Sequence, residues 1–198
     1  MLKIKIDFKS FLRKGLKNNK DDFLVSLING YQGSGKTYFA IYNIESTFTK
    51  KRTIYTNIKS YKSSTHNIIY FTYIEELYNN HDYNAIFLID ELSKKYTKDS
   101  KIDKPFYSWL QQSRKHSRYV YLITQEYLQV PNWLRGVANL SYTTKKIPLT
   151  PIMITTLGEP ILDKDTCEWG LHELSIRIYK RNKTIANMYD TNELINEL

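Results

Sequence analysis

The chain has 198 residues, 41% of them hydrophobic, which is typical of one globular α/β domain and leaves little room for a second catalytic domain. Its 29 Lys and Arg residues outnumber its 20 Asp and Glu residues and give a formal net charge of +9, which suits a polyanionic partner such as nucleic acid or an acidic membrane surface. A single cysteine, Cys167, excludes disulfide frameworks and cysteine-rich zinc sites, and the absence of any run of about 18 apolar residues predicts no transmembrane segment.

Residues 1–22 form a basic N-terminal arm whose conformation the sequence leaves open. Apolar residues near helical spacing favour an amphipathic helix, whereas the alternation in 2–6 is typical of a strand. Such an arm can touch DNA, a membrane face or a neighbouring subunit, and it can equally be a solvated arm or an edge strand. We expect residues 23–198 to form a single domain.

From Phe23 onward, short apolar runs alternate with segments of helical spacing. Strands are expected at Phe23–Ile28, Arg52–Ile58, Asn67–Thr72, Ala85–Ile89 and Arg118–Thr124. Helices are expected at 36–49, 73–80 and 106–116. The alternation predicts an α/β fold with a parallel sheet that is covered by helices on both faces.

Beyond Leu140 the pattern changes to one that is typical of antiparallel strands. Residues 140–147 are strand-like, and in 174–179 apolar residues alternate with polar ones, as in a half-buried strand. A turn at Arg181-Asn182-Lys183 is expected to lead into a partner strand at Thr184–Tyr189. The sequence therefore predicts a C-terminal antiparallel β-hairpin within an extension that covers 140–198.

A glycine-rich segment lies between the first strand and the first helix. Gly30-Tyr31-Gln32-Gly33-Ser34-Gly35-Lys36-Thr37 fills every required position of the phosphate-binding pattern G-x-x-x-x-G-K-[ST]. Its glycines let successive backbone N–H groups point at phosphate oxygens, and the helix N-terminus adds a favourable dipole. Lys36 can reach the β- and γ-phosphates of ATP, and the Thr37 hydroxyl can bind Mg²⁺. A chance glycine-rich turn is the alternative interpretation.

Two acidic residues, Asp90 and Glu91, follow the apolar run at 85–89. A buried strand would deliver them to the carboxyl edge of the sheet, where doubly wound folds place their sites. There Asp90 would hold Mg²⁺ through water, and Glu91 would polarise the attacking water as a general base. The alternative is that the acids only end the strand.

Gln125 ends the strand at 118–124. If this strand lies between the phosphate-loop strand and the Asp90 strand, Gln125 sits beside the γ-phosphate and can orient the water. The order of strands along the chain does not by itself establish their order in the sheet.

Together these residues resemble the FtsK–HerA superfamily of DNA-pumping ATPases, in its Zot-like and viral genome-packaging branch. The resemblance also rests on the following segments: Tyr55-Thr56-Asn57-Ile58, Arg114-Lys115-His116-Ser117-Arg118, Ile123-Thr124-Gln125, Leu134-Arg135 and Met188-Tyr189-Asp190-Thr191. It implies a RecA-like core with Gln125 as a polar sensor, assembled as a ring or other homo-oligomer around DNA. It also implies an arginine supplied to the neighbour's nucleotide, with Arg114 and Arg118 as the best candidates and Arg135 as the third.

The function that these observations favour is an ATP-driven motor that moves viral or mobile-element DNA, most simply into a capsid. Such a motor works in the host cytoplasm or on the virion, with capsid or portal-vertex proteins as partners. Basic residues that could follow the DNA backbone, irrespective of its sequence, are Lys94, Lys95, Lys98, Lys101, Lys104, Lys145, Lys146, Lys180, Arg181 and Lys183. A genome rich in A and T is the alternative source of the lysines.

Two other functions are compatible with the sequence. The first is a Zot-like phage assembly or secretion ATPase that acts at the membrane through a partner. The second is a nucleotide-switched assembly scaffold that barely hydrolyses ATP.

Overall fold

The structure, a computed structural model, describes residues 23–190, so the predicted arm at 1–22 lies outside the described residues. The strands are β1 (Leu24–Asn29), β2 (Thr53–Thr56), β3 (Asn67–Tyr70), β4 (Ile86–Ile89), β5 (Tyr119–Ile123), β6 (Leu140–Lys146), β7 (Ile152–Leu162) and β8 (Trp169–Lys180). The α-helices are α2 (Lys36–Thr47), α3 (Lys104–Gln111), α4 (Asn132–Val137) and α5 (Lys183–Ala186). Four short 3₁₀ segments complete the described part: η1 (Ile74–Leu77), η2 (Leu92–Lys94), η3 (Gln112–Arg114) and η4 (Tyr127–Gln129).

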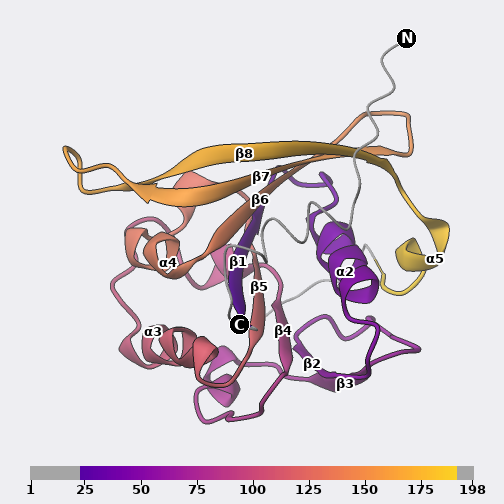
Figure 1. The fold of residues 1–198 in the computed structure, drawn as a ribbon, viewed down its shortest axis with the longest axis horizontal. Coiled ribbons are helices and arrows are strands. Elements are labelled where there is room, and N and C mark those ends of the chain that lie inside the picture. The colour runs from indigo at the N-terminus through magenta and orange to yellow at the C-terminus, as the bar shows by residue number, and fades with distance from the viewer. Residues whose placement is uncertain (1–22, 191–198) are drawn as a thin grey trace.

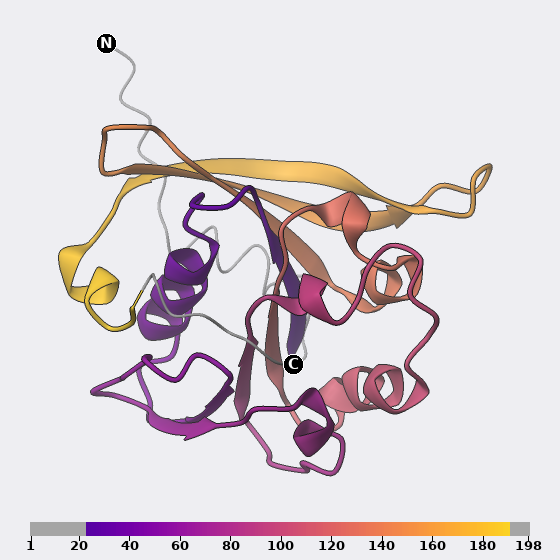
Figure 2. The ribbon, with the colours of Figure 1, turned by 180° about the vertical axis from the view of Figure 1, so that it is seen from behind.

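The strands form one eight-stranded sheet in the order β3-β2-β4-β5-β1-β6-β7-β8. The six strands from β3 to β6 run parallel, and β7 and β8 are antiparallel additions. Helices α2 and α5 lie on one side of the sheet, and α3 and α4 lie on the other (Figures 1 and 2). The predicted α/β architecture is therefore confirmed. Strand β5 also lies between β1 and β4, which is the arrangement required for Gln125 to face the nucleotide site.

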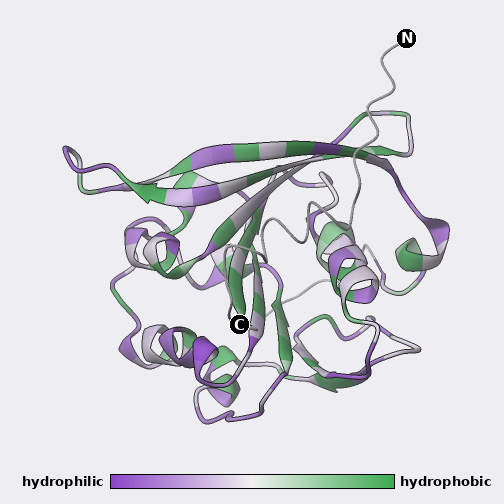
Figure 3. Cartoon of the chain, viewed as in Figure 1, coloured by the Kyte–Doolittle hydropathy of each residue, from purple (hydrophilic) through white to green (hydrophobic). Residues whose placement is uncertain are grey.

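Alternate residues of the central strands fill two separate cores. On β5, Tyr121 and Ile123 belong to the core beneath α2, whereas Val120 and Leu122 belong to the core beneath α3 and α4. Because both faces are covered, every residue of β1, β4 and β5 is buried. Their sequences are mostly apolar, and β4 is apolar throughout (Figure 3). Within residues 23–190, no helix has the length and hydrophobicity needed to cross a membrane.

Two of the predicted helices have different bounds in the structure. Helix α3 starts at Lys104, two residues before the predicted start, because the Asp103 carboxylate caps it and accepts a hydrogen bond from Phe106 N at 3.1 Å. It ends at Gln111 and continues only as η3. The helix expected over 73–80 is shortened to the 3₁₀ turn η1.

The C-terminal hairpin exists, but its predicted partner strand was wrong. Strand β8 pairs with β7, and the region predicted as the partner strand contains α5. The Asn182 side chain accepts a hydrogen bond from Thr184 N at 2.8 Å, so the expected turn is the cap of a helix.

Strand β7 was not predicted from the sequence, because Pro160 lies within it. Its last pair with β6 joins Gly158 to Ser141, and beyond that point β7 pairs only with β8. Pro160 therefore lies where one edge of the strand is open, and its missing N–H costs no ladder hydrogen bond.

Candidate functional site

The phosphate loop connects β1 to α2 and is held in shape by two neighbouring strands. Gly30 N donates to Gln125 O at 2.7 Å, and the hydroxyls of Ser34 and Thr144 are hydrogen-bonded at 3.0 Å. A Cβ at Gly30 would lie 2.5 Å from Thr144 O, so no larger residue fits there. Gly35, at the start of α2, has a φ of +86°, a left-handed conformation that favours glycine.

Lys36 folds back over this loop. Its Nζ donates to Gly30 O at 2.8 Å and to Tyr31 O at 3.1 Å. Burial lowers the pKa of Lys36, and the charges of Asp90 and Glu91 oppose that shift. The ammonium is therefore directed at the space that the loop encloses, where phosphate oxygens can replace the two carbonyls as acceptors.

Asp90 is positioned at the end of β4 by contacts with three other residues. Thr37 Oγ1 donates to Asp90 Oδ2 at 2.7 Å, and Glu91 N donates to Oδ1 at 2.7 Å. The Asn57 side-chain amide binds both backbone polar atoms of Asp90. Asp90 N donates to Asn57 Oδ1 at 2.8 Å, and Asn57 Nδ2 donates to Asp90 O at 2.9 Å. Asp90 is only 8% exposed, and burial raises its pKa, against the effect of its hydrogen bonds.

The Thr37 hydroxyl and the Asp90 carboxylate fit a magnesium ion. They are hard oxygen donors within hydrogen-bond distance of each other, beside the phosphate loop, and Mg²⁺ prefers such ligands together with substrate phosphates. Bound there, the ion would neutralise part of the charge that develops on the transferring phosphoryl group.

Glu91 lies in a turn that its own backbone makes. Its φ of +55° places it in the left-handed region, which is unusual outside glycine and directs the chain from β4 into η2. Its carboxylate forms an ion pair with the Lys94 ammonium, and both side chains are 42% exposed. The Glu91 side chain is therefore partly exposed at the mouth of the site, while its Oε2 atom, which pairs with Lys94, is buried.

A cavity of about 240 Å³ brings the predicted residues together. Its lining includes Gln32, Gly33, Lys36, Thr37, Asp90, Glu91 and Gln125. Tyr189 and Asp190 also line the cavity, and Asn57 holds Asp90 in place, although none of the three was predicted as a site residue. The only sequence signal for them was the family-like pattern around each, because their partners lie far away along the chain.

The three candidate arginines lie in different environments. Arg118 is 0% exposed, donates to Trp109 O and Asn80 O, and lies over an aromatic ring. Arg135 is 1% exposed and donates to Trp169 O. Neither guanidinium is presented to a neighbouring subunit in this conformation, so the burial of Arg118 and Arg135 counts against the prediction that one of them acts in trans. Arg114, at the end of η3, is exposed.

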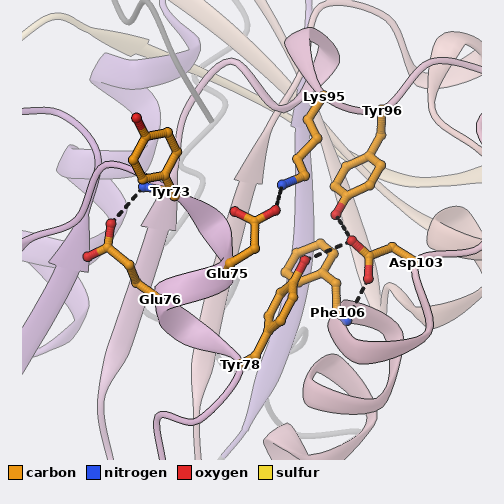
Figure 4. Close-up of polar contacts among 8 residues, drawn as sticks. All are labelled: Tyr73, Glu75, Glu76, Tyr78, Lys95, Tyr96, Asp103 and Phe106. Carbon is orange, nitrogen blue, oxygen red and sulfur yellow. Dashed lines mark hydrogen bonds and ion pairs between the residues drawn. The ribbon is translucent and has the colours of Figure 1, made fainter.

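The segment after Glu91 is anchored rather than loose (Figure 4). The Asp103 carboxylate accepts hydrogen bonds from Tyr78 Oη at 2.7 Å and from Tyr96 Oη at 2.6 Å. The Lys95 ammonium forms an ion pair with Glu75 of the same subunit. We call residues 92–103 the basic loop; its Lys94 and Lys98, and Lys101 as well, remain exposed.

Comparison with known proteins gives a family match. The family described as zonular occludens toxin (Zot) matches residues 24–191, which is most of the chain. No curated protein matches it.

Solved structures match over most of their own length. The N-terminal domain of zonular occludens toxin from Neisseria meningitidis has a TM-score of 0.61 at 19% identity, covering 84% of this chain and 98% of that one. The genome packaging NTPase B204 of Sulfolobus turreted icosahedral virus 2 has a TM-score of 0.52 at 12% identity, covering 77% and 96%. The RadB recombinase has a TM-score of 0.52 at 14% identity, covering 81% and 87%.

These likenesses show that the fold is RecA-like, with the additional antiparallel strands at its C-terminal side. The family match covers the phosphate loop, the acidic pair and Gln125 in one continuous stretch. The chain is therefore a P-loop NTPase that belongs to the zonular occludens toxin (Zot) family.

Proposed function

We propose that this protein is an ATP-hydrolysing motor that moves DNA, and that its task is to package viral or mobile-element DNA. The observation that carries the proposal is the single cavity lined by Lys36, the Thr37–Asp90 pair, Glu91 and Gln125. A site that only binds nucleotide needs the phosphate loop and a magnesium ligand. A second carboxylate beside the γ-phosphate position is needed only for hydrolysis.

Each residue has a distinct task in this proposal. The loop N–H groups and Lys36 bind the triphosphate, and Thr37 and Asp90 hold Mg²⁺. Glu91 accepts a proton from the attacking water as that water bonds to the γ-phosphorus, and the ADP oxygen leaves. Gln125 orients that water. It is held beside the loop by the hydrogen bond that Gly30 N donates to its backbone carbonyl.

Two considerations support DNA as the partner. The net charge of +9 suits a polyanion, and the basic loop begins at the residue that follows the catalytic acid. Among the structural neighbours, B204 is named as a genome packaging NTPase of a virus, and its likeness to this chain extends over 77% of the residues. Contacts of lysines with phosphates carry no base readout, as a motor that grips every stretch of a genome requires.

The proposed motor works as a homo-oligomer, most simply a ring, in the cytoplasm of the host cell or at the virion. Capsid or portal-vertex proteins are its expected partners. Arg114 is the remaining candidate for an arginine that completes the neighbour's site, because it is exposed and the other two candidates are buried.

Two substitutions test the enzymatic part of the proposal. Lys36→Ala removes a ground-state phosphate contact and should weaken ATP binding, whereas Glu91→Gln should bind ATP and hydrolyse it more slowly by on the order of 10²-fold. Turnover is measured with and without DNA across a salt series; DNA should raise it, and the effect should fall log-linearly with salt. Normal hydrolysis by Glu91→Gln would remove Glu91 from this role. Turnover that no DNA changes at low salt would favour the assembly scaffold.

A further inference from the structure

A second cavity adjoins the phosphate loop on the side of α5. Its volume is about 370 Å³, and it shares Gly33, Lys36, Thr37 and Tyr189 with the first cavity. The two therefore meet where a triphosphate would lie. A third cavity of about 300 Å³ touches the loop through Gly30 and Tyr31 and includes neither Lys36 nor Thr37.

The second cavity is lined by groups that suit a flat, polar ligand. The Arg181 guanidinium lies over the Tyr38 ring, 5.4 Å from its centroid. Both partners are fixed: Arg181 N donates to Pro151 O at 2.7 Å, and Asn182 N donates to Tyr38 Oη at 2.7 Å. The apolar side chain of Met153 closes the cavity next to Gly35.

Arg181 also has an unused hydrogen-bond donor. Its Nε is buried and has no hydrogen-bond partner among the described residues. A buried donor without an acceptor is costly, so an acceptor supplied by a ligand in this cavity would be favourable. A planar guanidinium that is already stacked on a ring can bind a further planar group on its other side.

We propose that this second cavity binds the nucleoside part of the nucleotide, with the base against the Arg181–Tyr38 pair and the Arg181 guanidinium donating to the nucleoside. The inference rests on the proposed function, because it assumes that the phosphates occupy the loop. Tyr189 lines both cavities and thus lies where the phosphates join the ribose. The sequence alone had suggested Arg181 as a DNA contact; its place beside Tyr38 assigns it to the nucleotide instead.

The test compares two ligands that share a triphosphate and differ in the nucleoside. Binding of Mg²⁺–ATP and of inorganic tripolyphosphate is measured by calorimetry for the unaltered protein, Arg181→Ala and Lys36→Ala. Arg181→Ala should weaken ATP binding about tenfold, the loss expected for a hydrogen bond to a charged group, and leave tripolyphosphate within about twofold. Lys36→Ala should weaken both ligands. Lys164→Ala, at an exposed position between β7 and β8, is the control for loss of a positive charge and should change neither.

The outcomes separate this proposal from the broader one. Equal loss of both ligands in Arg181→Ala, or no loss of ATP, would overturn the nucleoside assignment while the phosphate site stands. Failure of the unaltered protein to bind either ligand would overturn the nucleotide site itself. If Arg181→Ala unfolds, Arg181→Lys replaces it: the charge remains and the planar stacking group is lost, so ATP should still weaken relative to tripolyphosphate.

Discussion

Asp90 shows how a single residue can be costly for folding and necessary for the site. Its carboxylate is almost completely buried, yet two of its hydrogen bonds come from groups that also face the nucleotide cavity, Thr37 Oγ1 and Glu91 N. Burial raises its pKa, which means that the folded protein disfavours the ionised form that a magnesium ion requires. Folding stability is thus given up at this position for ligand binding.

The substitution Asp90→Asn should reveal that exchange. The asparagine amide keeps the shape of the side chain and an acceptor oxygen but carries no buried charge. The ligand-free variant should therefore melt at the same temperature as the parent protein or a few degrees higher. Each kcal/mol gained in the free energy of unfolding raises the melting temperature by roughly 2–4 °C. Thermal unfolding with and without Mg²⁺–ATP measures this, and the stabilisation by Mg²⁺–ATP should disappear in the variant.

The pH dependence of this difference has a defined sign. Because the folded-state pKa of Asp90 lies above its unfolded-state value, the native state binds more protons between the two values. The contribution of Asp90 to stability therefore increases as pH falls through that window. The advantage of Asp90→Asn should be largest above the window and shrink on acidification; a stability gap that widens with acid would contradict this account.

The motif residues were predictable because the chemistry fixes their spacing. Lys36 and Thr37 must follow the last loop glycine, and Asp90 and Glu91 must follow a buried strand. The tie between Asn57 and the Asp90 backbone spans 33 positions, so no local pattern could reveal it. The burial of Arg118 was equally hidden, because its ring and carbonyl partners come from other elements.

At the level of elements, the parallel core followed the sequence closely and the added strands did not. A strand that is buried on both faces is mostly apolar and does not alternate, and for that reason 85–89 and 118–124 were recognisable. Apolar and polar residues do alternate along β8, as predicted, but the apolar residues lie on the exposed face. Ile176 and Ile178 are more than half exposed. Arg177 instead packs against Tyr42 and Tyr179 beside α2.

The basic loop depends on one carboxylate that serves three donors. Asp103 caps α3 and accepts the hydroxyls of Tyr78 and Tyr96; burial alone would raise its pKa, but these hydrogen bonds outweigh that effect and lower it. Asp103→Ala removes a helix cap and leaves two hydroxyls without an acceptor. We expect a loss of about 2–4 kcal/mol in the free energy of unfolding, measured by urea denaturation.

Two controls make the loop prediction specific. Asp99→Ala, at an exposed position in the same loop, should change stability by less than about 0.5 kcal/mol. Because the folded-state pKa of Asp103 lies below its unfolded value, its contribution is present above the unfolded pKa and is lost as pH falls through the folded one. The deficit of Asp103→Ala should therefore shrink in acid, and an unchanged deficit would count against the carboxylate as its source.

At the scale of the whole molecule, β5 runs between the two ends of the sheet, the one where the parallel strands begin and the one where they finish. Its carboxyl end leads to Gln125 at the molecule's own site, and its amino end follows the segment that carries Arg114. Five residues of strand span about 17 Å. An arginine at the amino end of the strands can complete a nucleotide site only on another subunit. A contact that joins the amino end of one subunit's sheet to the carboxyl end of another's is head-to-tail, and repeated head-to-tail contacts form a ring when the rotation between subunits closes it.

Mixing two inactive variants tests this arrangement. Arg114→Ala subunits keep Glu91, and Glu91→Gln subunits keep Arg114. A complete site forms where a Glu91-bearing subunit meets an Arg114-bearing neighbour, so an equal random mixture should recover about a quarter of the parental turnover, with a maximum near equal proportions. Lys115→Ala mixed with Glu91→Gln is the control, because Lys115 is exposed beside Arg114 and its variant should already be active alone. If mixed assemblies form and turnover stays at the level of the separate variants, Arg114 does not act across the interface. The sites would then be complete within each subunit, since the other two candidate guanidiniums are already committed to their own core.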